Sequence, residues 1–249
     1  MAQICTSNPG KLWAGLLALV LLLGACGAPA VRPLRLGDAP WQSGEQANYT
    51  LLDADDNPMG TALLALSQEP VNGAPGWVLR RQVTGSGGSE VSSVSMSAAG
   101  YRPAQSALSI SDSAGTERVS ATYDQGEVNL DLTTKLNNTT VQRINVPSDA
   151  RDQRSLWTLV RTLPLAQGYA TELNSFLPLT GRLERVTVTV GKEEQVNVAA
   201  GLFDAWNIVI DYGDRQTRLW IGVDAPHALV KVEDGGLTWE LAQLENGAP

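Results

Sequence analysis

The sequence predicts a mainly β protein, an antiparallel sheet with one packed α-helix. Segments in which apolar and polar residues alternate recur from residue 45 to residue 241, and turn signals separate them at intervals of about 8–12 residues. One stretch, residues 152–163, breaks this rhythm and has the spacing of a helix face. A single helix amid roughly a dozen strands must lay its apolar face on a sheet.

The first half of the chain is typical of a meander of hairpins. Glycine, proline, asparagine and aspartate gather at the expected turns, near residues 53–58, 72–76, 85–88, 112–115 and 124–126. Strands are expected over residues 45–52, 60–67, 77–83, 91–96, 105–110, 117–123 and 128–132. In the segment 91–96 neither face is clearly apolar.

The second half repeats this pattern. Strands are expected over residues 186–190, 195–198, 203–212, 216–223, 228–233 and 237–241. A turn at Gly191 and Lys192 would make the residues that follow, Glu193 and Glu194, part of a charged hairpin tip. No repeat of a solenoid or propeller and no second linker occurs, so one domain is expected.

The helix is predicted from the spacing of its apolar residues, which are Leu156, Leu159, Val160 and Leu163. Either Asp149 or Asp152 can cap its start, and Pro164 ends it. We expect this apolar face to pack on the concave side of the sheet.

The N-terminal region has the features of a secretory signal. Lys11 precedes an apolar run over residues 12–23, which is short of the ~20 residues that a membrane span needs. The run leads into Leu23-Gly24-Ala25-Cys26, which resembles the bacterial lipobox, in which a diacylglycerol is attached to the cysteine and the chain is cut before it. Residues 1–25 are therefore expected to be a lipoprotein signal peptide.

This interpretation predicts the layout and the address of the protein. Cys26 would carry the lipid that binds the chain to a membrane, residues 26–40 would form a proline-rich tether, and residues 41–245 a single β domain. Because Gly27 rather than an aspartate follows the cysteine, the expected location is the periplasmic face of the outer membrane. In a cell with one membrane it is the extracellular face of that membrane.

Charge and cysteine content narrow the possible functions. The formal net charge is −8, and removal of residues 1–25, with Lys11 and no acidic residue, makes it more negative. An acidic domain repels phosphate backbones, which argues against nucleic-acid binding. The two cysteines, Cys5 and Cys26, leave the mature domain without a disulfide or a free thiol. We expect a monomer.

Few residues could carry chemistry. The single histidine, His227, follows Asp224 and could be a general base, but no G-x-S-x-G nucleophile motif accompanies it. One histidine without free cysteine is also too little for zinc. The run 53–57 holds three aspartates and an asparagine that could bind calcium, but a solvated turn accounts for them better. No catalytic residue, metal site or cofactor is therefore predicted, and the protein is not expected to be an enzyme.

Tryptophan is frequent in a chain with two phenylalanines. Six of the seven tryptophans lie in the mature region: Trp41, Trp77, Trp157, Trp206, Trp220 and Trp239. They could line an apolar ligand groove, or they could fill the core.

Several motifs in a fixed order resemble a β-rich bacterial envelope family that is catalogued as a domain of unknown function. They are the G-E-x-x-x-Y start with Glu45 and Tyr49, Tyr101-Arg102-Pro103, Tyr123-Asp124, D-x-x-S-L from Asp152, R-x-L-P-L from Arg161, and E-x-x-V-x-V-x-A-G-x-F-x-A from Glu193. The resemblance covers about residues 41–235, and it names no catalytic residue. The serine-rich stretch 86–97 departs from the family pattern.

The family is distantly similar to the lipoprotein-localisation carriers, whose curved sheets hold acyl chains beneath helical lids. The resemblance implies a strongly curved antiparallel sheet or open β-barrel with one packed α-helix. It also hints at an apolar or lipid-like ligand. From the residues themselves we expect a binding module that holds such a ligand between helix and sheet, at Trp157, Leu156, Leu159 and Val160. The alternative is a structural or protein-interaction component of the envelope with a filled core.

Overall fold

The alternating segments of the sequence form strands of one sheet in the computed structural model, which describes residues 30–247. Within these residues the strands are β1 Val31–Arg32, β2 Glu45–Leu52, β3 Pro58–Val71, β4 Ala74–Gly85, β5 Gly88–Ser97, β6 Pro103–Asp112, β7 Gly115–Asp124, β8 Glu127–Thr133, β9 Thr139–Asn145, β10 Arg151–Asp152, β11 Ala170–Leu177, β12 Arg182–Val198, β13 Gly201–Asp211, β14 Gln216–Gly222, β15 Leu229–Asp234 and β16 Leu237–Glu245. A 3₁₀ turn, η2 (Gln153–Ser155), leads into the helix α1 (Leu156–Val160).

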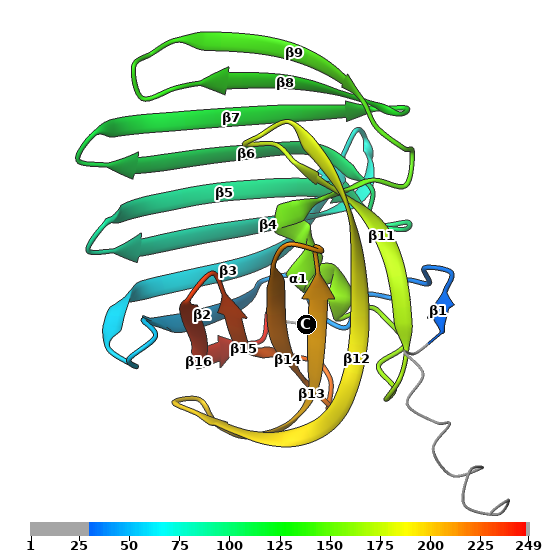
Figure 1. Cartoon of the computed structure of the whole chain (residues 1–249). Coiled ribbons are helices and arrows are strands. Elements are labelled where there is room, and N and C mark those ends of the chain that lie inside the picture. Colours follow the sequence, from blue (N-terminus) through cyan, green and yellow to red (C-terminus); the bar gives the residue numbers. More distant parts are fainter. Residues whose placement is uncertain (1–29, 248–249) are drawn as a thin grey trace, which may run out of the picture. The chain divides into compact units, whose positions relative to one another are not determined.

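The sheet consists of two antiparallel meanders joined in the middle. Strands β2–β9 pair in sequence, as do β11–β16, and β16 pairs with β2 to connect the two. The short strands β1 and β10 pair with β11 in parallel. Figure 1 shows β11–β16 curving around α1 and facing the row of strands β2–β9. This arrangement confirms the predicted fold, a strongly curved antiparallel sheet with one packed helix, open rather than closed.

Side-chain packing joins the two ends of the sheet, which are not paired with each other by backbone hydrogen bonds. The path of paired strands ends at β9 on one side and at β1 on the other. The β11–β12 hairpin crosses toward β9, where a Cβ at Gly181 would lie only 3.0 Å from Cδ1 of Ile144. Phe176 of β11 is fully buried against Tyr123 of β7, with ring centres 6.0 Å apart. The sheet therefore approaches a barrel through packing rather than through a closed ladder.

Buried apolar residues among the described part of the chain gather in two clusters on one face of the sheet, called the inner face here. The larger cluster joins β2–β4 and β11–β16 to α1, and includes Trp157, Trp239 and Leu79. The smaller one joins β6–β8 to the β11–β12 hairpin, and includes Leu108 and Phe176. On β5, which lies between β4 and β6, Met96 belongs to the larger cluster, whereas Ser92 is paired with Leu108 of the smaller one.

The helix is shorter than predicted and is buried on every side. The α-helical part spans five residues, and all five are buried, including Trp157 and Thr158 outside the predicted apolar face. Asp152, one of the two predicted caps, accepts a hydrogen bond from the backbone N–H of Arg154. The helix is packed as expected, but its burial is not limited to the predicted apolar face, because protein also covers the opposite side.

The N-terminal segment of the domain provides part of this cover. Leu34 and Leu36 line a small cavity together with Leu159, Val160 and Leu163. The backbone N–H of Gly37 donates to the carbonyl of Thr162 at 2.8 Å. The last ten residues of the predicted tether thus lie on the domain, while the predicted signal peptide and Cys26 lie outside the described residues.

Strand β12 also differs from the expectation. Residues 182–198 form one strand, and the glycine and lysine expected to turn, at 191 and 192, sit instead at an irregularity in its pairing with β13. Glu194 lies within this strand and not at a hairpin tip. Its carboxylate accepts hydrogen bonds from Asn207 Nδ2 at 2.8 Å and from Trp220 Nε1. The sequence pattern could not reveal that the strand continues across the glycine.

Across residues 30–247, no helix has the length and apolar character that a membrane crossing requires.

Candidate ligand site

The residues predicted to hold a ligand form part of the core. Leu156, Leu159 and Val160 are at most 2% exposed, and Trp157 packs edge-on against Trp239 with ring centres 5.2 Å apart. The cavity beside Leu159 and Val160 measures about 10 Å³, which is at the lower limit for one water molecule. Side chains therefore fill the space between helix and sheet where the ligand was expected.

The other residues singled out in the sequence have structural contacts. His227 Nδ1 lies 3.0 Å from the carbonyl oxygen of Gly222, and the His227 carbonyl accepts from Arg161. Asp53 Oδ1 accepts hydrogen bonds from the backbone N–H groups of Asp55 and Asn57 within its own turn. These hydrogen bonds lower the pKa of Asp53, with those from Asn57 contributing most.

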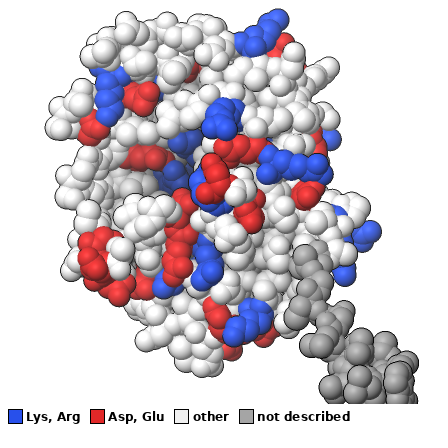
Figure 2. Space-filling model, viewed as in Figure 1, with Lys and Arg blue, Asp and Glu red and all other residues white. Residues whose placement is uncertain are grey.

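A hollow of about 270 Å³ opens at one end of the inner face, and we call it the mouth hollow. Its apolar lining comes from the ends of β2, β3, β4, β6 and β16, through Leu51, Met59, Val83, Ile110 and Leu237. Figure 2 shows this side of the molecule hollowed, with acidic and basic side chains gathered at the hollow. The sequence analysis did not anticipate this space.

Glycine allows the strands to meet closely at the mouth. Ser86 and Gly87 form the tight turn between β4 and β5, and Gly88 opens β5 with a φ of +139°. A Cβ at Gly88 would lie 2.2 Å from the carbonyl oxygen of Ser111. Any side chain at this position would clash with β6, so the turn depends on glycine for its shape.

Glu90, a lining residue of the mouth hollow, belongs to a charged group with Arg81 and Arg154, which we call the guanidinium cluster. Glu90 lines the hollow beside Val83, its cross-strand neighbour. Arg81 of β4 donates through Nη2 to Glu90 Oε1, and Nε of Arg154 lies 3.8 Å from the same oxygen. Two cations from separate parts of the fold therefore share one carboxylate oxygen.

Both guanidinium groups are held away from water. The side chains of Arg81 and Arg154 are 16% and 9% exposed. The Arg81 guanidinium lies 5.6 Å from the ring centres of both Trp157 and Trp239, a cation–π arrangement that fixes its position. Burial lowers the pKa of Arg154, because a charged group loses solvation there.

A second polar contact lies farther along the inner face. Tyr123 donates its hydroxyl hydrogen to Asp152 Oδ2 at 2.6 Å. Burial and the nearby Asp152 carboxylate raise the pKa of Tyr123, since both disfavour the phenolate. The Asp152 carboxylate thus both caps the helical turn and ties it to β7.

The strand pattern contained a signal for the guanidinium cluster. Along β4, Leu79 and Val83 face inward, and Arg81 stands between them at the same parity. Glu90 precedes Val94 and Met96 on the inward parity of β5. A charged residue at an inward position indicates either a buried ion pair or a binding site.

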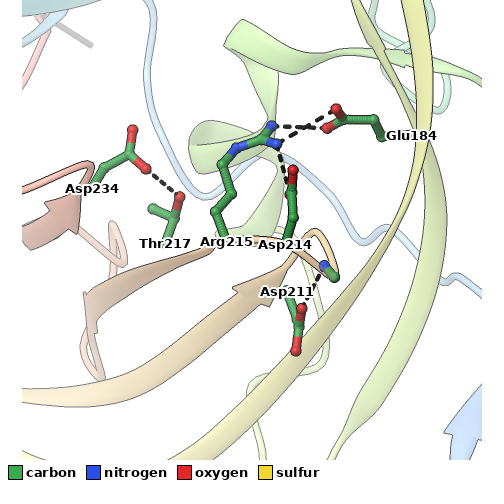
Figure 3. Close-up of polar contacts among 7 residues, drawn as sticks. Glu184, Asp211, Asp214, Arg215, Thr217 and Asp234 are labelled. Atoms are coloured by element: carbon green, nitrogen blue, oxygen red, sulfur yellow. Dashed lines mark hydrogen bonds and ion pairs between the residues drawn. The ribbon is translucent and has the colours of Figure 1, made fainter.

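Polar contacts also hold the β13–β14 turn. Arg215 donates through Nη2 to Glu184 Oε2 of β12 at 2.8 Å and contacts Asp214, while Thr217 donates to Asp234 Oδ1 at 2.6 Å (Figure 3). The Arg215 guanidinium lies 4.1 Å from the ring centre of Tyr212. Burial raises the pKa of Tyr212 to about 12. These contacts tie neighbouring strands together and serve as scaffold.

A larger groove lies on the opposite, outer face of the sheet. It measures about 600 Å³ and crosses β4–β8. Small side chains such as Ser93, Ala107 and Ser120 form its floor, and Arg80 and Arg118 flank it. This groove is larger than the mouth hollow but lacks a buried charge, so it resembles a contact surface more than a ligand site.

The fold and this interior define an open, barrel-like β protein with a charged group beneath an apolar mouth. Residues 47–241 match the family described as "Protein of unknown function (DUF3108)", and the chain belongs to that family. The family supports the resemblance seen in the sequence. No curated protein matches the sequence.

One solved structure shows the same type of fold. A β-barrel-like protein of domain of unknown function DUF1849 from Brucella abortus superimposes with a TM-score of 0.57 at 12% identity, over 86% of this chain and 100% of that chain. A "putative exported protein" with a YmcC-like fold from Bacteroides fragilis gives a TM-score of 0.28 at 14% identity, over 85% of this chain and 100% of that chain. A "putative lipoprotein" from Parabacteroides distasonis gives 0.30 at 13% identity, over 85% and 100%.

Proposed function

We propose that the protein is a lipid-anchored, non-enzymatic binding module of the bacterial envelope, and that its apolar or lipid-like ligand binds in the mouth hollow. The lipobox ending at Cys26 supports the anchor and the location. Gly27 after the cysteine favours the periplasmic face of an outer membrane where there are two membranes. The module acts as a monomer, without a cofactor.

The mouth hollow is the observation that carries the proposal. It combines an apolar wall with a few polar groups at its floor, which is the usual composition of a small-molecule site. Its volume of about 270 Å³ is near the lower end of the range of roughly 300–1,000 Å³ for such sites. The proposed ligand site therefore lies at the strand ends and not beside the helix, where side chains fill the space.

Substitutions at the mouth test this function. Met59 and Leu237 line the hollow and are 39% and 38% exposed, so either can be enlarged without disturbing the core. Leu237→Trp in the full-length protein, reconstituted in phosphatidylcholine nanodiscs, should weaken saturable binding of a dansyl-labelled undecanoic acid. Leu202→Trp, at a residue 64% exposed outside the hollow lining, should bind as the wild type does. Equal binding by both variants and the wild type would refute a site at the mouth.

The structural or protein-interaction alternative rests on a different observation, the groove on the outer face. Val91 lines this groove and is 52% exposed, so an apolar side chain is available to a partner there. In-cell cross-linking from position 91 tests it. If one partner protein is cross-linked from this position, and the Leu237→Trp variant cross-links to it as well as the wild type does, the interaction role would be favoured over the ligand role.

A further inference from the structure

The guanidinium cluster is the most unusual feature inside the protein. Arg81 and Arg154 both lie at the inner face, and Glu90 is the one carboxylate in residues 30–247 that forms an ion pair with either of them. In the part of the chain that the structure describes, Nε of each arginine is buried without a hydrogen-bond acceptor. The cluster therefore holds two buried N–H donors without an acceptor, an unfavourable arrangement that a further acceptor would relieve.

The surroundings do not supply the missing acceptors. The residue beside Arg81 on the inner face of β5 is Ser92, which is followed on β6 by the apolar Leu108. Asp152 lies close to Arg154 and its negative charge acts on that guanidinium, but its two oxygens accept hydrogen bonds from the Arg154 backbone N–H and from the Tyr123 hydroxyl, and the Arg154 Nε gains no acceptor from it. The mouth hollow, which Glu90 lines, is the side from which a further acceptor could reach the cluster.

We propose that Arg81 and Arg154 recognise an anionic oxygen group, a carboxylate or a phosphate, at the head of an apolar ligand whose chain lies in the mouth hollow. This inference rests on the proposed function and specifies its ligand class. The Arg81 guanidinium lies against Trp157 and Trp239, so its donors are oriented before the ligand arrives. Glu90 competes with the ligand for the same donors.

The arrangement has a defined energetic consequence. Hydrogen bonds from a guanidinium to a carboxylate or phosphate are stronger than those between neutral groups, and arginine can form two in parallel. A ligand with an anionic head should thus bind at least about tenfold more tightly than its neutral alcohol. The apolar wall alone cannot make this distinction, because both ligands have the same chain.

Four ligands with one chain length test the proposal: octanoic acid, octyl phosphate, octanol and octylammonium. Each is titrated into the full-length protein in phosphatidylcholine nanodiscs, with tryptophan fluorescence as the signal and protein-free nanodiscs as the reference. Either acid should bind more tightly than octanol, and the tighter of the two identifies the head group. Arg81→Gln and Arg154→Gln should reduce the affinity for the acids to that of octanol.

Two further variants keep the test decisive. Glu90→Gln removes the competing carboxylate and should tighten binding of the acids even if the arginine variants unfold. Arg80→Gln is the matched control, because Arg80 is the chain neighbour of Arg81 on the outer face, with a side chain 53% exposed. It should leave all four affinities unchanged.

The outcomes separate this inference from the proposed function. Octanol binding as tightly as the acids would overturn the anionic head group while leaving an apolar ligand in place. A preference for octylammonium, or weaker acid binding by Glu90→Gln, would make Glu90 the recognition group and overturn the proposal. Saturable binding of none of the four would overturn both.

Discussion

Arg161 and Glu45, 116 residues apart in the sequence, form a two-pronged ion pair inside the domain. Arg161 Nη1 and Nη2 donate to Oε1 and Oε2 of Glu45 at 2.7 and 3.0 Å, and the two side chains are 5% and 4% exposed. Arg161 also donates to the carbonyls of Pro226 and His227. This pair connects β2, the end of the helix and the β14–β15 loop.

The pair also gives a structural role to two of the motifs that resemble the family. Glu45 belongs to the G-E-x-x-x-Y start, and Arg161 begins R-x-L-P-L. The tyrosine of the first motif, Tyr49, donates to the carbonyl of Leu229 at 2.9 Å. Tyr101 of a third motif donates to the carbonyl of Gly37 at 3.1 Å. These motif residues therefore join distant parts of the chain and hold the fold together.

Breaking the buried pair should destabilise the protein strongly. Arg161→Met leaves the Glu45 carboxylate buried without its partner, so the free energy of unfolding should fall by about 3–5 kcal/mol. Chemical denaturation measures the loss. The double variant Glu45→Leu with Arg161→Met should be more stable than Arg161→Met alone, since no charge remains buried. Arg80→Met, in an exposed pair with Glu69, should cost less than about 1 kcal/mol.

Truncation of the helix core should also be costly. Leu159 is 2% exposed and packs within the larger cluster. Leu159→Ala should lower the free energy of unfolding by about 2–5 kcal/mol. Leu136→Ala, at a side chain 81% exposed, is the control and should change it by less than about 0.5 kcal/mol. A loss at Leu159 as small as the control's would mean that the helix is only loosely attached.

Glu194 should give the protein part of its sensitivity to acid. The hydrogen bond from Trp220, followed by the one from Asn207, lowers the pKa of Glu194 below its ordinary value of 4.5. A lowered carboxyl pKa stabilises the fold above the unfolded value, and this contribution disappears as pH falls through the folded value. Trp220→Phe removes the main donor, so stability at pH 7 should fall by about 1 kcal/mol.

The pH profile distinguishes this effect from lost packing. The decline in unfolding free energy below pH 4.5 should be shallower in Trp220→Phe than in the wild type. Trp206→Phe, which removes an indole that is not bonded to Glu194 in the structure, should keep the wild-type profile. Parallel profiles for Trp220→Phe and the wild type would show that the indole donor does not set the Glu194 pKa.

The segment before residue 41 should contribute to stability. Its Leu34 and Leu36 pack against the larger cluster, and Gly37 bonds to Thr162 and Tyr101. A chain that begins at residue 41 should therefore unfold at a lower temperature than one that begins at residue 30. Both chains should be monomers in analytical ultracentrifugation. Equal melting temperatures would mean that residues 30–40 act only as a tether.

Lipid attachment at Cys26 is tested directly by substitution. Cys26→Ser removes the thiol on which the diacylglycerol would be placed, so the variant should lose its lipid mass and its cleavage before residue 26. Mass spectrometry of the wild type should show a lipid-modified N-terminal cysteine. A wild-type chain with an unmodified Cys26 would contradict the lipobox interpretation.

Local pattern was sufficient for many of the strands. Strand β2 has the bounds expected from its alternation, residues 45–52, and β3–β8 and β13–β16 overlap their expected segments. Strand β9 was missed because most of its residues are exposed on both faces, which leaves no alternation to detect. Strand β11 lies in a region for which the sequence analysis expected no strand.

The sequence by itself determined the strand periodicity, most of the turns and the two candidates for the helix cap, Asp149 and Asp152, because each depends on residues a few positions apart. Only the tertiary structure decided that α1 is buried on all sides, since its cover comes from Leu34 and Leu36, more than a hundred residues away. The same holds for the candidate site. Arg81 and Arg154 meet at Glu90 because a curved sheet brings the turn before α1 onto β4 and β5, and no local pattern encodes that contact.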